Sequence, residues 1–121
     1  MPEVQRRRWR DYSSPSGRRP VREFFADLSD TDTAAIVAAM KEVAMEGLSA
    51  ARHLRGEIYE VRADGDRAAY RVLFAPQGRR GQVLLALEAL KKQTQKTPAG
   101  TIRLAERRLR DWRSRARVYH S

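Results

Sequence analysis

The chain has 121 residues, of which 41% are hydrophobic, and its formal net charge is +10. This length and apolar content predict one domain, spanning residues 1–121, with a modest core, and they argue against a wholly disordered chain. The chain has no cysteine, few histidines and no apolar run near the roughly 20 residues that cross a bilayer, which excludes disulfides, a thiolate nucleophile, cysteine- or histidine-rich metal sites and a membrane helix.

The N-terminal part of the sequence predicts an edge strand followed by a pair of helices. Residues 6–14 fit a short strand that leads into a loop containing proline and glycine. A first helix is expected from Pro20, because proline favours the first helical position. A second helix is capped by Ser29 or Asp30 and ends at Gly47. Both segments gather apolar residues on one side, so we expect a helical hairpin.

The middle of the sequence changes to the period of β-structure. In the first of its strands Glu60 and Arg62 share one face, because their positions differ by two. The last of its strands is apolar almost throughout, which is typical of a strand buried on both faces. The expected strands are residues 57–63, 68–76 and 83–90, with turn signals at 64–66 and 77–81.

A basic helix is expected over about residues 99–117, with one narrow apolar stripe. The predicted order is therefore β-α-α-β-β-β-α, an α+β fold. The first strand has to join the other three, because an isolated strand is not stable. The result is a small twisted four-stranded antiparallel sheet, with the helical hairpin on one face and the C-terminal helix near a sheet edge.

Positive charge is concentrated at the two ends of the chain. Residues 1–22 carry a net charge of +5, residues 23–90 a net charge of −3 and residues 91–121 a net charge of +8. Such a distribution favours a polyanionic partner, since each neutralised phosphate releases counterions. The basic N-terminus is not followed by an apolar stretch and so does not fit a secretory signal. We expect a cytoplasmic protein without a membrane partner.

Arg71 is unusual because an arginine inside a central strand has to find an anion. That anion is either an external ligand or an internal carboxylate, Glu60 or Glu88. If the flanking strands pair through the 64–66 turn, residues whose numbers sum to about 130 lie opposite one another. A bulge or a slip by one residue would instead bring Arg71 onto the face of Arg62. The sequence leaves both registers open.

The segment KKQTQKTP, residues 91–98, directly follows the most buried predicted strand. Its lysines, amides and hydroxyls suit phosphate, sugar and base-edge contacts, although the same composition is typical of a solvated loop. No nucleotide-binding loop or hydrolase motif is present in the sequence. Cations near a carboxylate can still cleave RNA without a metal, because the 2′-hydroxyl is an internal nucleophile.

Four motifs in order, Y-E-x-R, Y-R-x-x-[FY], K-K-x-T-Q-K-T-P and A-E-R-R, resemble those of RelE/HigB-like toxins of type II toxin–antitoxin systems. The resemblance covers about residues 6–113 and is closest to the phage-derived branch of the RelE/ParE superfamily. It implies the same fold and a ribosome-dependent mRNA endoribonuclease that cleaves RNA through a 2′,3′-cyclic phosphate without a cofactor. It also implies as partners mRNA, ribosomal RNA and an inhibiting antitoxin with a helix-turn-helix domain.

The resemblance further implies roles for individual residues. Arg62 and Arg71 match basic strand positions and would stabilise charge at phosphorus. Glu88 stands where many members carry a histidine, which leaves Glu88 or Glu60 as the base. The implied catalytic set is Arg62, Arg71, Lys92, Glu88 and Glu60. The implied RNA-binding set is Lys91, Gln95, Lys96, Arg103, Arg107 and Arg108.

Two other functions stay open at this point. The same fold occurs in non-enzymatic toxins that bind a protein such as DNA gyrase, and fold alone does not separate the two classes. The chain also fits a basic RNA-binding module without catalysis, because Glu88 replaces the expected histidine.

Overall fold

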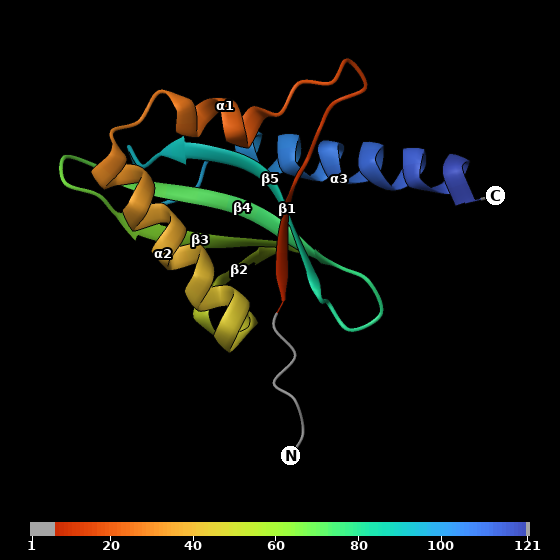
Figure 1. The fold of residues 1–121 in the computed structure, drawn as a ribbon, viewed down its shortest axis with the longest axis horizontal. Coiled ribbons are helices and arrows are strands. Elements are labelled where there is room, and N and C mark those ends of the chain that lie inside the picture. The colour runs from red at the N-terminus through yellow and green to blue at the C-terminus, as the bar shows by residue number, and fades with distance from the viewer. Residues whose placement is uncertain (1–6, 121) are drawn as a thin grey trace.

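The computed structural model describes residues 7–120, with side chains described up to residue 116. The described residues form three α-helices and one sheet of five strands (Figure 1). The elements in chain order are β1 (Arg8–Asp11), α1 (Pro20–Ala26), α2 (Asp30–Glu46), a 3₁₀ turn (Leu48–Ala50), β2 (Arg52–Arg55), β3 (Ile58–Asp64), β4 (Ala69–Gln77), β5 (Val83–Lys91) and α3 (Ala99–His120). The α+β class is confirmed.

The sheet differs from the prediction in strand number and in direction. Its order is β1-β5-β4-β3-β2, and β1 pairs with β5 in parallel, whereas the other pairs are antiparallel. The prediction of four antiparallel strands was therefore wrong. Strand β2 was missed because RHLR contains one apolar residue and shows no alternation of buried and exposed positions. The edge strand predicted at 6–14 is β1, and Arg6 lies outside the described residues.

The helical hairpin forms as predicted, on one face of the sheet. Helix α1 begins at Pro20, and the backbone N–H of Asp32 donates to Ser29 Oγ at the start of α2 over 3.1 Å. Gly47 ends α2 with φ near 90°, a conformation that glycine adopts without strain. The two helices bury their apolar stripe against β3, β4 and β5. This core contains Val21, Ile36, Met40, Val43, Val61, Val72, Phe74 and Leu84.

Helix α3 begins at Ala99, as predicted, and lies across the opposite face of the sheet (Figure 1). Ala105 and Leu109 of α3 pack in a second core. That core contains Tyr12, Ile58, Leu73, Ala75, Leu85 and Leu87. The expected position near a sheet edge was therefore wrong, because the apolar stripe of α3 covers three central strands. No helix among the described residues is long and apolar enough to cross a membrane.

The register between β3 and β4 places Arg62 directly opposite Arg71. The pairing assumed from the sequence was wrong by three residues. The connection closes with the Gly65 N–H donating to the Ala68 carbonyl over 2.7 Å, so the turn reaches further than the three residues 64–66. Arg62 and Arg71 consequently share the face of the sheet that α3 covers.

Candidate functional site

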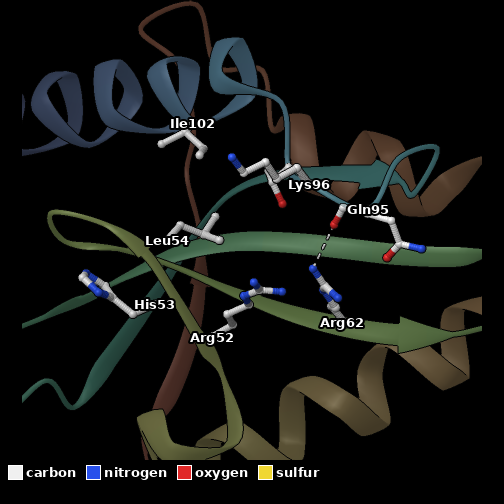
Figure 2. Close-up of a pocket in the computed structure, with 8 residues that line it drawn as sticks. Arg52, His53, Leu54, Arg62, Gln95, Lys96 and Ile102 are labelled. Carbon is white, nitrogen blue, oxygen red and sulfur yellow. Dashed lines mark hydrogen bonds between the residues drawn. The ribbon is translucent and has the colours of Figure 1, made fainter.

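A polar pocket of about 180 Å³ opens where α3 begins, beside the β2 edge of the sheet. Figure 2 shows its side chains converging from β2, β3 and the loop that joins β5 to α3. Its lining residues are Arg52, His53, Leu54, Arg62, Gln95, Lys96, Thr97 and Ile102. Three of these side chains are cationic at neutral pH, so the pocket is suited to an anion.

The β2–β3 hairpin brings the two arginines of the pocket together. Arg52 pairs with Glu60 across the strands, and Arg62 follows Glu60 by two residues, so both arginines project from the same face. Gly56, with φ near 54°, provides the left-handed residue of the turn. The Arg55 guanidinium also donates to Glu106 of α3 and lowers the pKa of that carboxyl. This contact ties the hairpin to the first turns of α3.

Arg62 is the half-exposed cation of the site, with 37% of its side chain accessible. Its Nε donates to Glu60 Oε1 over 2.8 Å, and its Nη2 donates to the Gln95 carbonyl over 3.4 Å. A guanidinium has five N–H donors, so Arg62 retains donors for a ligand in the pocket. Arg62 lines the pocket, and its catalytic role stays a prediction.

Arg71, by contrast, is 1% exposed. Its Nη2 donates to the Thr94 and Gln95 carbonyls, each over 2.7 Å, and its Nε lies 3.6 Å from Glu60 Oε2. The internal pair with Glu60, which the sequence left open, is therefore the arrangement in this protein. Arg71 contacts the loop from below and does not line the pocket.

Glu60 is fully buried between its partners. Its Oε2 accepts a hydrogen bond from Thr97 Oγ1, while its Oε1 accepts from Arg62. A carboxylate that is shielded from solvent and already accepts from two side chains is badly placed to receive a proton from a substrate.

Glu88 lies away from the pocket, beneath α3. Its Oε1 accepts from Arg108 Nη1 over 3.2 Å, and Arg108 Nη1 also donates to the Leu87 carbonyl over 2.7 Å. Both side chains are about one-fifth exposed. Glu88 and Arg108 thus form a contact between β5 and α3, and the structure does not bring Glu88 together with Arg62.

The lysines of the loop diverge. Lys96 is exposed and lines the pocket, and Lys92 lines a neighbouring hollow of about 420 Å³ with Gln93, Thr94 and Gln95. Lys91 lies on the other face of the sheet, because it pairs with Tyr70, whose side chain belongs to the core under the helical hairpin. It lines a separate pocket with Asp32 and Arg67.

Two of the predicted RNA-binding arginines form a line on α3. Arg103 and Arg107 are exposed and four residues apart, so they lie on the same side of the helix. Neither side chain has a hydrogen bond or ion pair with a described residue. They continue the positive charge of Lys96 and Arg62 along α3, because Ile102 at the start of that helix lines the same pocket.

Sequence reasoning missed Arg52 and His53, since β2 was not recognised as a strand. The available signal was Gly56, a hairpin residue just before the strand that begins at Ile58. The His53 ring points away from Arg62 in Figure 2, packs 4.9 Å from Tyr59 and donates from Nε2 to the Gly56 carbonyl. His53 therefore does not take the place of the histidine that the resemblance leads us to expect at position 88. Within the described residues, no three side chains of the metal-binding types converge.

The chain matches the family described as "Phage derived protein Gp49-like (DUF891)" over residues 23–110. No curated protein matches it. This family belongs to the RelE/ParE-like toxin superfamily, which suggests a toxin of a toxin–antitoxin system and implies an antitoxin partner. Because the match covers well over half of the sequence, the chain belongs to the Gp49-like family of phage-derived proteins.

Proposed function

We propose that this protein is a RelE/HigB-like toxin that cleaves mRNA on the ribosome and so inhibits translation. The observation that carries the proposal is the pocket in which Arg52, Arg62 and Lys96 meet, in a member of a toxin family. The exposed Arg103 of α3 directly follows Ile102, which lines the pocket, so a phosphate chain that leaves the pocket along α3 has further cations to bind.

The reaction that fits these residues is attack of a 2′-hydroxyl on the adjacent phosphorus. The new bond forms from the 2′-oxygen, the bond to the 5′-oxygen breaks, and the products are a 2′,3′-cyclic phosphate and a 5′-hydroxyl. Negative charge builds up on the non-bridging oxygens in between. Arg62, with Arg52 beside it, is placed to stabilise that charge through N–H donors of fixed geometry.

Proton transfer in this proposal does not involve a carboxylate of the pocket. Glu60 is buried among its donors and Glu88 lies under α3. We assign the protonation of the leaving 5′-oxygen to Lys96, whose exposed ammonium lines the pocket. The proton of the 2′-hydroxyl passes to water, and the arginines favour its loss by stabilising the anion that results.

Binding to ribosomal RNA is assigned to Arg103 and Arg107, which are exposed and have no hydrogen bond or ion pair with a described residue. Lys92 and Gln95 extend the contact on the other side of Lys96. The arginine-rich segments 6–10 and 103–117 carry further cations for this role, and Arg6 and the side chain of Arg117 lie outside the described parts of the chain. The helix-turn-helix domain of the antitoxin and the cytoplasmic location stay predictions from the sequence.

A second candidate is a toxin that binds RNA without cutting it. The engagement of Glu60 and Glu88 by arginines favours it, because the pocket then lacks a carboxylate base. Such a protein would bind RNA strongly at low salt and weakly at high salt, with no cleavage products.

Induced expression with mapping of mRNA 5′ ends tests the proposal. Wild-type protein is expected to arrest growth and to produce cuts confined to translated mRNA, and Arg62→Ala is expected to lose both effects. Arg79→Ala is the matched control, because Arg79 is exposed in the turn between β4 and β5, at the far end of β4 from Arg71. It is expected to behave like the wild type.

The other outcomes of this experiment oppose the proposal. Growth arrest with intact mRNA would indicate the binding-only toxin, and arrest with DNA-damage signalling would indicate a target such as gyrase. Normal growth with uncut mRNA would show that the protein is not toxic to the cell.

A further inference from the structure

We propose that Glu60 is a positioning residue, which fastens the loop between β5 and α3 to the sheet and thereby holds Arg62 and Lys96 in place around the pocket. The structural part of this inference stands on the contacts of Glu60 alone. Its catalytic consequence rests on the proposed function.

The loop has no apolar anchor of its own. Residues 93–96 are all exposed, and Thr97 is half-buried. A segment with this composition gains little from burial of hydrocarbon, so its position has to come from hydrogen bonds to the sheet below it. The side-chain hydrogen bond within the loop, from Thr94 Oγ1 to the Lys96 carbonyl, does not reach the sheet.

The first attachment is the hydrogen bond from Thr97 Oγ1 to Glu60 Oε2. Thr97 precedes Pro98, whose carbonyl accepts from the N–H groups of Thr101 and Ile102 in the first turn of α3. Glu60 therefore holds the point where the loop ends and the helix begins. Because Glu60 is buried in β3, this point is tied to the interior of the sheet rather than to its surface.

The second attachment runs through Arg71. Its Nη2 donates to the Thr94 and Gln95 carbonyls, and Glu60 supplies the neighbouring negative charge at 3.6 Å from its Nε. A guanidinium that is 1% exposed requires such a counter-charge. Arg71 thus binds the loop, and the negative charge of Glu60 offsets the cost of burying the Arg71 guanidinium.

The third attachment is Arg62, which is shared between Glu60 and the loop. Its Nε binds Glu60 Oε1 and its Nη2 reaches the Gln95 carbonyl, the same oxygen that accepts from Arg71. One buried carboxylate therefore contacts Thr97 of the loop and both arginines that reach the loop from the sheet. Lys96 lies between these attachments, so its place beside the pocket depends on the same contacts.

Glu60→Gln is a poor first test, because it would leave the guanidiniums of Arg62 and Arg71 without their carboxylate. A mobile loop could then not be distinguished from an unfolded domain. Thr97→Val removes only the hydroxyl that Glu60 accepts from and keeps the branched shape. Thr97→Ser restores the hydroxyl, and Thr94→Val makes the same change in the same loop at a hydroxyl that does not contact Glu60.

The measurement is the ¹⁵N order parameter of the backbone at Lys96 and Thr97 in each purified variant. We expect rigid values of about 0.85 in the wild type and Thr97→Ser, and values falling toward about 0.6 in Thr97→Val. Thr94→Val is expected to stay near the wild type at Thr97, because the Thr94 hydroxyl contacts the Lys96 carbonyl and not Glu60. Wild-type order in Thr97→Val, or an equal loss at Thr97 in Thr94→Val, would overturn the fastening role.

Cleavage of ribosome-bound mRNA by the same variants tests the consequence. Thr97→Val is expected to lower the rate at saturating RNA about tenfold with little change in half-saturating RNA concentration, because binding is spread over many cations while orientation depends on the loop. Thr97→Ser should recover the rate. Equal rates for Thr97→Val and the wild type would contradict the positioning role. If no variant cleaves RNA but the order parameters change as expected, the proposed function fails and the fastening stands.

Discussion

Two regions on one face of the sheet, only two residues apart along each strand, are held in opposite ways. Under α3, Ile58 of β3 and Leu73 of β4 pack in an apolar core. Two residues further along β3, Glu60 forms a buried ionic cluster under the loop with Arg71, which lies two residues from Leu73 in β4. The difference follows from the covering segment, since α3 presents an apolar stripe and the loop does not.

The comparison shows what each kind of contact contributes. Apolar packing stabilises in proportion to buried area and tolerates small shifts. A buried ion pair adds little net stability compared with hydrocarbon, because desolvation offsets its attraction, but its geometry is demanding and losing one partner is costly. The apolar region therefore stabilises the domain, and the ionic region determines where the loop and Arg62 lie.

The largest effect is expected in the apolar region. Leu73→Ala removes a fully buried side chain between β4 and α3 and should lower the free energy of unfolding by about 4 kcal/mol. Met45→Ala is the control, because Met45 is 59% exposed and its loss should change stability by less than about 0.5 kcal/mol. Urea unfolding followed by circular dichroism measures both. Similar losses of unfolding free energy in the two variants would contradict the placement of Leu73 in an apolar core.

The next effect separates the two arginines that face each other across β3 and β4. Arg71→Met leaves part of the charge of Glu60 buried without its partner and should cost about 3 kcal/mol of unfolding free energy. Arg62→Met should cost less, about 1.5 kcal/mol, because Arg62 is 37% exposed and Arg71 still faces Glu60. The same urea titration compares them. A larger loss of unfolding free energy in Arg62→Met than in Arg71→Met would contradict the assignment of Arg71 to structure and of Arg62 to the pocket.

A pH effect is expected on the opposite face of the sheet, where Asp32 is a buried carboxylate. The Tyr70 hydroxyl and then the Asp66 N–H donate to it, which lowers its pKa below the ordinary value of 3.8. The ionised carboxylate therefore stabilises the fold at neutral pH, and this contribution is lost as the pH falls through its lowered pKa.

Asp32→Asn should accordingly lower stability at pH 7 and flatten the decline in stability below about pH 4. Unfolding in urea at pH 7, 4 and 3 measures the slope. Asp64→Asn, at an exposed aspartate on the end of β3, should leave the slope nearly unchanged. An unaltered slope in Asp32→Asn would show that this carboxylate is not the group that titrates.

The smallest effect concerns the exposed surface of α3. Arg107→Ala should weaken RNA binding to a similar degree for different sequences and reduce the slope of log affinity against log salt by about 1. Fluorescence anisotropy with a single-stranded RNA at several salt concentrations measures the affinity and its salt dependence. Arg79→Ala serves as the equal-charge control, and an identical slope of log affinity against log salt for both variants would show that α3 does not bind the RNA.

The sequence predicted those features that local chemistry determines. Ser29 and Gly47 define the ends of α2 because capping depends on single residues and their immediate neighbours. The place of Arg71 inside a strand and the place of Lys96 in a loop follow from the hydrophobic pattern. The sequence did not reveal which of Arg62 and Arg71 is buried, because both satisfy the same local pattern and the loop above them decides.

Two other misses have a common cause in pairing between distant segments. Strand β2 is defined by its pairing with β3, since Arg52–Arg55 has little strand character of its own. Lys91 and Lys92 are adjacent in sequence yet line different hollows, because Lys91 still belongs to β5 and faces the helical hairpin. Register and facing are tertiary properties, and composition does not contain them.

Cleavage of ribosome-bound mRNA by the purified protein, with analysis of the product ends, tests the central claim most directly. The account predicts a 2′,3′-cyclic phosphate and a 5′-hydroxyl for the wild type and for Arg79→Ala, and a loss of at least about a hundredfold in rate for Arg62→Ala. Intact mRNA with the wild-type protein, or equal cleavage by Arg62→Ala, would contradict it.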